Sequence, residues 1–189
     1  MIIGLSGVLA AGKDTVAEYL EEKRGFQHVS LSAILREMVG EMGLEINLEN
    51  LTEVGNSLKE KDGPACLVEK AKRKADFDQD LVISSIRQPG EIERLRQERD
   101  FFMIFVSADP KVRFERLLKR NRSGDVTDFD EFLKLEAEQM DGKAGGMNLG
   151  KCREMSDYFL ENNGTIVEFE DKIEKTLDEI KAKIKNEQK

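Results

Sequence analysis

The chain has 189 residues, charged side chains at 36% of its positions and a formal net charge of −8. This length allows one α/β domain with a sizeable core, and the acidic balance argues against a protein that binds the nucleic-acid backbone. No apolar run approaches the roughly 20 residues that a membrane-spanning helix needs. Because Cys66 and Cys152 lie outside any CxxC spacing and the first residues show no leader pattern, we expect reduced thiols in a cytoplasmic protein without a membrane or nucleic-acid partner.

The first predicted strand, residues 2–6, runs directly into the sequence GVLAAGKDT at residues 7–15. A strand, a GxxxxGK loop and a helix are typical of a phosphate-binding loop, and the alternative is a glycine-rich turn before an ordinary helix. In a phosphate-binding loop the backbone N–H groups and the helix N-terminus surround a triphosphate tail, and a lysine reaches its outer phosphates. We therefore expect an ATP site formed by Gly7, Ala10, Ala11, Gly12, Lys13, Asp14 and Thr15.

Short apolar runs alternate with longer amphipathic ones along the chain, which is typical of a parallel sheet with crossover helices. The strands are predicted at residues 2–6, 27–30, 81–85, 102–107 and 158–161. The helices are predicted at about 13–23, 31–42, 48–61, 65–75, 90–98, 110–120, 128–140 and 166–185. In the last helix, apolar residues three and four apart predict a stripe that faces the sheet, formed by Ile166, Phe169, Ile173, Leu177, Ile180 and Ile184.

Two long segments are inserted after strands, a helical one over about 31–76 and an arginine-rich one over about 113–147. Ligands bind beyond the carboxyl ends of parallel strands, so we expect both insertions to flank the phosphate loop. One insertion can hold a phosphate acceptor, and the other can close over the donor as a lid that excludes water.

Arginines lie where the strand ends and the insertions are expected to converge. Arg36 lies one turn into the helix after the second strand, and Arg87 lies just past the third. Arg116 and Arg120 share one helix face because they are four residues apart. Phosphoryl transfer needs positive charge around the moving group, and for each arginine the alternative is a solvated surface position. The predicted catalytic set is Lys13, Arg87, Arg116, Arg120 and Arg122, with Arg113 as a further cation of the same insertion.

Residues 28–36, with the sequence HVSLSAILR, resemble the segment of nucleoside monophosphate kinases that begins the acceptor-binding helix. In that family the arginine binds the acceptor phosphate, which implies this role for Arg36 and places Ser30 at the acceptor site. The family's Thr, Gly and Asp are replaced by Leu31, Ser32 and Ala33.

Two further segments resemble small kinases of the dephospho-coenzyme A kinase-like and deoxynucleotide kinase-like group. The sequence VISSIRQPGE at residues 82–91 resembles the segment around the third strand, which implies that Arg87 is a second clamp on the acceptor phosphate. The sequence SDYFLENNGT at residues 156–165 resembles the last strand of dephospho-coenzyme A kinases, which implies that Asn163 and Gly164 lie beside the adenine of ATP.

The resemblance spans nearly the whole chain and implies a three-layer α/β/α P-loop kinase fold in one domain, residues 1–189. It implies a five-stranded parallel sheet in the order 2-3-1-4-5, an acceptor-binding insertion over about 31–76 and an arginine-rich lid over about 113–147. The implied cofactors are ATP and Mg²⁺, and the protein is expected as a monomer or a homodimer.

A metal hypothesis follows from one departure from these relatives. Most of them have a hydroxyl after the lysine and a carboxylate at the end of the third strand, whereas this chain has Asp14 and Ser84. Mg²⁺ prefers hard oxygen ligands and takes one or two from the protein. We therefore predict that Asp14 and Ser84 serve the metal, directly or through water. The competing interpretation is that Asp14 caps the loop backbone while Thr15 touches an inner phosphate.

The leading functional interpretation is an ATP- and Mg²⁺-dependent kinase that phosphorylates a nucleoside or deoxynucleoside monophosphate. His28, the one histidine, is expected to be a packed and satisfied imidazole rather than a base. A phosphate acceptor needs no strong base because its oxygen is already ionised near neutral pH. The alternatives are a dephospho-coenzyme A kinase-like phosphotransferase and a nucleotide-binding regulator without turnover.

Overall fold

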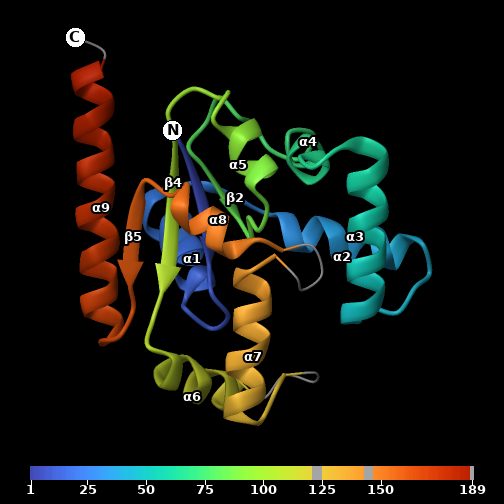
Figure 1. Cartoon of the computed structure of the whole chain (residues 1–189). Helices are drawn as coiled ribbons and strands as arrows, with labels where there is room; N and C mark the ends of the chain where they lie inside the picture. Colours follow the sequence, from blue (N-terminus) through green and yellow to red (C-terminus); the bar gives the residue numbers. More distant parts are fainter. Residues whose placement is uncertain (121–124, 143–146, 188–189) are drawn as a thin grey trace.

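Five strands form one parallel sheet in the order β2-β3-β1-β4-β5, as predicted. In Figure 1 the outer strand β5 lies between β4 and α9. The structure is a computed structural model that describes residues 1–120, 125–142 and 147–187. Each strand lies within one residue of its predicted bounds: β1 Ile2–Gly7, β2 Gln27–Ser30, β3 Leu81–Ser84, β4 Phe101–Ser107 and β5 Tyr158–Glu161. The central strands β1, β3 and β4 are buried almost throughout because helices cover both faces of the sheet.

Because all five strands are parallel, their carboxyl ends lie at the same edge of the sheet. β1 pairs with β4 from Ile2 opposite Phe101 to Gly7 opposite Val106. Gly7 has a φ of +146°, and a Cβ there would lie 2.1 Å from the carbonyl oxygen of Val106. Only glycine therefore fits where β1 turns into the phosphate loop.

The helices of the described residues follow the predicted pattern with three differences, one of which is that the helix predicted at 90–98 ends at Leu95. Their bounds are α1 Lys13–Arg24, α2 Leu31–Glu41, α3 Leu48–Asp62, α4 Cys66–Ala71, α5 Pro89–Leu95, α6 Pro110–Arg120, α7 Phe129–Met140, α8 Leu149–Glu154 and α9 Ile166–Glu187. The helix predicted at 65–75 ends at Ala71, and the six-residue α8 was not predicted. Asn148 caps α8 by accepting a hydrogen bond from the backbone N–H of Lys151, so a polar cap rather than apolar periodicity starts this helix.

The two faces of the sheet carry separate apolar cores. α1 and α9 cover one face, where Val16, Leu20, Phe169 and Ile173 are buried together. The other face is covered by α2, α4, α5 and α8, and its core includes Leu31, Ile34, Ile92 and Cys152. In the predicted stripe of α9, Ile166 is 55% exposed, because it is the first residue of the helix and precedes the part that packs on the sheet.

In Figure 1 the first insertion lies to one side of the sheet, whereas α6 and α7 of the second lie beyond the arrowhead of β4. The first contains α2, α3 and α4, which share a small cluster of Val39, Val54, Leu58 and Cys66. In the second, the described arginines lie on α6. Helix α7 is acidic, because it has one basic residue, Lys134, and four acidic ones, Asp130, Glu131, Glu136 and Glu138. Among the described residues, no helix is both long enough and apolar enough to cross a membrane.

Candidate active site at the phosphate loop

The loop between β1 and α1 has the backbone of an anion cradle. Ala10 and Gly12 have φ values of +58° and +102°, and Gly12 is the N-cap of α1 without a side-chain cap. A Cβ at Gly12 would lie 2.4 Å from Nδ2 of Asn162, so this position also requires glycine. A helix N-terminus that no side chain caps leaves backbone N–H groups for an anion, as the GxxxxGK pattern predicts.

Lys13 folds back on its own loop. Its Nζ donates to the carbonyl oxygens of Gly7 at 2.9 Å and of Val8 at 2.8 Å. Burial lowers the pKa of Lys13 to about 7, and the nearby positive charge of Arg87 adds to the effect. A bound phosphate would supply the negative charge that favours the protonated ammonium.

Arg36 and Arg87 approach each other and the loop from two different strand ends. Burial lowers the pKa of Arg87, and repulsion from Arg36 contributes to the same shift. One Nη of Arg87 lies 3.7 Å from the sulfur of Met147. Within the described residues no carboxylate forms an ion pair with Arg36 or Arg87, so this pair of guanidinium groups is suited to a phosphate.

A polar pocket of about 400 Å³ lies between the loop and the first insertion. Arg36 and Arg120 contribute positive charge to its wall, and Asp14 contributes a carboxylate. Its lining residues are Asp14, Ser30, Ser32, Ala33, Arg36, Ser85, Arg120 and Asp125. Predicted donor-side and acceptor-side residues therefore share one cavity.

The two residues of the metal hypothesis have different surroundings. Asp14 is exposed on the pocket wall, whereas the Ser84 hydroxyl is buried and lies 2.8 Å from Nε2 of His28. The neighbouring residue Ser85, with a φ of +65°, lines the pocket instead. Asp14 offers a hard oxygen beside the loop and fits Mg²⁺, while the role of Ser84 stays a prediction that requires its hydroxyl to leave His28.

His28 is satisfied, as predicted, but on an edge strand. Besides its contact with Ser84, its Nδ1 lies 3.8 Å from a carboxylate oxygen of Glu21. The imidazole is half-buried on β2, the outermost strand beside β3.

The arginines of α6 have different surroundings. Arg116 donates from Nη2 to Oδ1 of Asn162 at 3.3 Å, and its buried Nη1 has no hydrogen-bond partner among the described residues. Arg120 forms a two-pronged ion pair with Asp125, with both N–O distances at 2.7 Å. Arg122 lies outside the described residues.

Arg113 is neither a lid cation nor a solvated charge. Its side chain is 2% exposed, and its Nε donates to the carbonyl oxygen of Ala108 at 2.7 Å. Nη1 donates to the carbonyl oxygen of Leu9 in the phosphate loop at 3.3 Å, and both Nη atoms pair with Glu136 of α7. The residues next to Arg113 in the sequence do not indicate this burial, because its partners Leu9 and Glu136 lie on other elements.

Asn162 was not predicted as a site residue. It is buried at the end of β5, and its Nδ2 donates to the carbonyl oxygen of Ala11 at 3.0 Å. Next to it, Oδ1 of Asn163 accepts from the backbone N–H of Asp109 at 2.7 Å, which holds the loop after β4. The predicted place of Asn163 and Gly164 beside adenine stays a prediction. The doubled Asn in ENNGT was the available sequence signal for Asn162.

Glu91 is the second residue that the sequence reasoning missed. Its buried carboxylate accepts from the backbone N–H groups of Arg87 at 2.8 Å and Gln88 at 3.1 Å. Burial raises the pKa of Glu91 to about 7, against the lowering effect of these two hydrogen bonds. The pattern QPGE, with Pro at the first helical position and Glu two residues later, is a recognisable start signal for α5. Glu91 thus fixes the backbone that presents Arg87.

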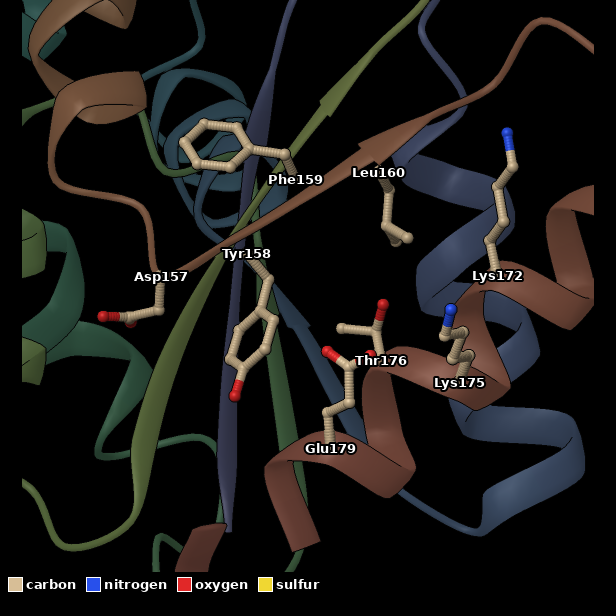
Figure 2. Close-up of a pocket in the computed structure, with 8 residues that line it drawn as sticks. All are labelled: Asp157, Tyr158, Phe159, Leu160, Lys172, Lys175, Thr176 and Glu179. Atoms are coloured by element: carbon tan, nitrogen blue, oxygen red, sulfur yellow. The ribbon is translucent and has the colours of Figure 1, made fainter. Parts of the chain in front are cut away.

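A second pocket lies along the outer strand β5, beside α9 (Figure 2). Tyr158 and Leu160 point toward α9, while Phe159 points to the opposite face of the sheet (Figure 2). No residue of the phosphate loop lines this pocket. Its polar groups are Asp157, Lys172, Lys175, Thr176 and Glu179, and we assign it no role in catalysis.

Comparison with known proteins shows the family of the chain and proteins of similar fold. The family described as the AAA domain matches residues 6–134. A UPF0200 protein of Thermococcus kodakarensis is 33% identical over 97% of this chain and its own full length, and one of Pyrococcus horikoshii is 31% identical over 95% of this chain and 97% of its own. Among solved structures, the fold is similar to a shikimate kinase of Bacteroides thetaiotaomicron, with a TM-score of 0.60 and 16% identity over 94% of this chain and 98% of that one. It is also similar to a gluconokinase of Sinorhizobium meliloti, with a TM-score of 0.54 and 16% identity over 97% and 93%.

Proposed function

The chain belongs to the AAA-domain family and has a P-loop kinase fold, and we propose that it is an ATP- and Mg²⁺-dependent nucleotide kinase. Its acceptor would be a nucleoside or deoxynucleoside monophosphate. The observation that carries this proposal is the pair Arg36 and Arg87, which forms no ion pair with a carboxylate among the described residues. Arg36 lies close enough to Arg87 to repel it, and Arg87 acts in the same way on Lys13. In the reaction an acceptor phosphate oxygen forms a bond to the γ-phosphorus, the bond from that phosphorus to the β–γ bridging oxygen breaks, and ADP leaves.

On the donor side, the loop N–H groups and Lys13 would hold the β- and γ-phosphates, with Thr15 at an inner phosphate. Arg116 has a buried N–H group available for the donor, and Arg120 can stabilise the transferring group once it exchanges Asp125 for phosphate oxygens. Mg²⁺, held by Asp14 and phosphate oxygens, would neutralise charge that develops on the phosphates. On the acceptor side, Arg36 and Arg87 would clamp the monophosphate beside Ser30.

A second candidate is transfer to a hydroxyl, as in a dephospho-coenzyme A kinase-like enzyme. The observation that favours it is Asp14, an exposed carboxylate on the wall of the same pocket that contains Arg36. A carboxylate there can accept the proton that an alcohol loses on attack. A monophosphate acceptor does not need this step.

The decisive experiment is acceptor-dependent release of ADP, measured with a panel of nucleoside and deoxynucleoside monophosphates and with dephospho-coenzyme A. Lys13→Ala should abolish the activity, and Arg36→Ala should raise the KM of the acceptor about tenfold or more while leaving the KM of ATP near its wild-type value. Activity with dephospho-coenzyme A alone would favour the second candidate. ATP binding without release of ADP for any acceptor would favour a regulator, and unchanged acceptor kinetics in Arg36→Ala would contradict the acceptor site.

A further inference from the structure

Arg113 is the most completely enclosed charged side chain of the described residues, and the phosphoryl-transfer chemistry does not use it. Its guanidinium joins three elements: the loop after β4 through Ala108, the phosphate loop through Leu9, and α7 through Glu136. The Glu136 side chain is 19% exposed, so the pair is largely shielded from water. The ring of Phe132 lies 5.2 Å from the guanidinium carbon and covers it from a further side.

A buried ion pair is not the most stabilising way to fill this space. Removing two charges from water is unfavourable, and well-packed apolar side chains of similar volume are often equally or more stabilising. What an apolar pair cannot do is donate a hydrogen bond to a chosen carbonyl group. The contact from Nη1 of Arg113 to the carbonyl oxygen of Leu9, at 3.3 Å, is such a directional contact within the phosphate loop.

Leu9 lies between the two glycines that shape the loop. Because a peptide group is planar, a carbonyl held on one side fixes the direction of the N–H group of the next residue, Ala10. Ala10 has the left-handed φ of +58°, so its conformation depends on such external contacts more than that of an ordinary turn residue. Glu136 in turn holds the guanidinium by two nitrogen atoms, which sets its plane.

We propose that Arg113, oriented by Glu136 of α7, is a positioning residue that holds the phosphate loop in the conformation that binds the donor nucleotide. This inference rests on the proposed function only in taking ATP as the ligand of the loop. It separates the role of Arg113 from those of Arg116 and Arg120, which act on the phosphates or the pocket directly. It also explains what α7 contributes to the site, because one ion pair transmits the position of this helix to the loop.

The test compares Glu136→Gln with Glu138→Gln. Both changes remove one negative charge from α7, but Glu138 forms no ion pair within the described residues. We measure binding of a nonhydrolysable ATP analogue by calorimetry, the KM values of ATP and of the acceptor, and the thermal midpoint. Glu136→Gln should weaken analogue binding and raise the KM of ATP about tenfold, with the KM of the acceptor within twofold of wild type. Glu138→Gln should leave the affinity for the analogue and both KM values within twofold of wild type.

Analogue binding by a folded Glu136→Gln protein that equals that of Glu138→Gln overturns the inference. If Glu136→Gln does not fold, the double variant Arg113→Met/Glu136→Leu replaces the ion pair by apolar packing and leaves the Leu9 carbonyl without its donor. This variant should fold and bind the analogue about tenfold more weakly, and wild-type binding by it overturns the inference as well. A wild-type protein that binds the analogue but phosphorylates no acceptor contradicts the proposed function and leaves this inference standing.

Discussion

The helices of the proposed acceptor side and of the proposed donor side are held in place by different forces. On the acceptor side, α2, α3 and α4 pack on one another through a small apolar cluster around Val54 and Leu58. On the donor side, α7 is attached through aromatic packing and through the ion pair of Arg113 and Glu136, and this guanidinium also contacts the phosphate loop. Apolar packing is non-directional and tolerates changes of shape, whereas hydrogen bonds fix direction. The proposed donor side is therefore the more sharply defined half, and mutations should separate the two sides.

The largest effect is expected at Gly7, where the donor loop leaves the sheet. Gly7→Ala would place a Cβ 2.1 Å from the Val106 carbonyl oxygen at a φ of +146°. We expect a loss of more than about 3 kcal/mol in the free energy of unfolding, measured by chemical denaturation. The control is Gly40→Ala on α2, where a Cβ meets nothing within 4 Å and the change should be within about 1 kcal/mol and favourable. Equal losses in the two variants would contradict the comparison.

Core truncations on the two sides should differ in their effect on ATP. Phe132→Ala removes a ring that is 1% exposed and lies 5.5 Å from the ring of Phe114, and we expect a loss of about 3–5 kcal/mol in stability together with weaker ATP binding. Leu58→Ala, at a side chain that is 8% exposed, should lose about 2–3 kcal/mol and leave ATP binding unchanged. Calorimetric titration at a temperature where both variants are folded measures the difference. Equal weakening by Leu58→Ala would show that the sides are not separable.

The stability contributed by the buried carboxyl group of Glu91, which holds the backbone of Arg87, should depend on pH. Burial raises the pKa of Glu91 to about 7, above its unfolded value near 4.5, so its contribution to stability is complete below about pH 4.5 and is lost as pH rises through 7. Glu91→Gln keeps an oxygen acceptor and cannot ionise, so its stability relative to wild type should rise by about 3 kcal/mol between pH 4.5 and 8.

Glu93→Gln on the exposed side of the same helix is the matched control for Glu91→Gln. Its stability difference from wild type should stay nearly constant over this pH range. Denaturation curves at several pH values provide the measurement. A Glu91→Gln difference that does not change with pH would mean that the buried carboxylate is not the titrating group.

The smallest effect is expected at the exposed ion pair of Lys151 and Glu154 on α8. Their side chains are 58% and 66% exposed, so water and salt screen the pair. Lys151→Ala should change stability by less than about 0.5 kcal/mol and leave ATP binding unchanged, in contrast to changes at the buried pair of Arg113 and Glu136. A loss above about 1 kcal/mol would contradict this ranking of exposed and buried pairs.

Local pattern was sufficient for most of the fold. The apolar runs placed all five strands within one residue, and the resemblance to small kinases implied the sheet order that the structure shows. The six-residue α8 was missed because it is too short for apolar periodicity, and its start signal is the single cap Asn148. Ile166 was predicted to face the sheet but is exposed, because a periodic stripe does not say at which turn a helix first meets the sheet.

The candidate site was only partly predictable. The GxxxxGK pattern placed the phosphate loop, and matches to kinase segments placed Arg36 and Arg87 near it. The sequence did not show which of two neighbouring serines at the end of β3 faces the pocket. In the structure Ser84 contacts His28 and Ser85 lines the pocket. Which of two adjacent hydroxyls faces a cavity depends on the turn after the strand, where Ser85 adopts a φ of +65°.

The sequence by itself determined the strands, the phosphate loop and the residue types available to bind phosphate, because these depend on local periodicity and on glycine at fixed spacing. Only the tertiary structure decided the partners of the polar groups. Arg113 contacts Leu9 and Glu136, and Asn162 contacts Ala11, across separations of 23 to 151 residues. A buried polar group must find its partner wherever the packed elements bring one, and no local pattern records that choice.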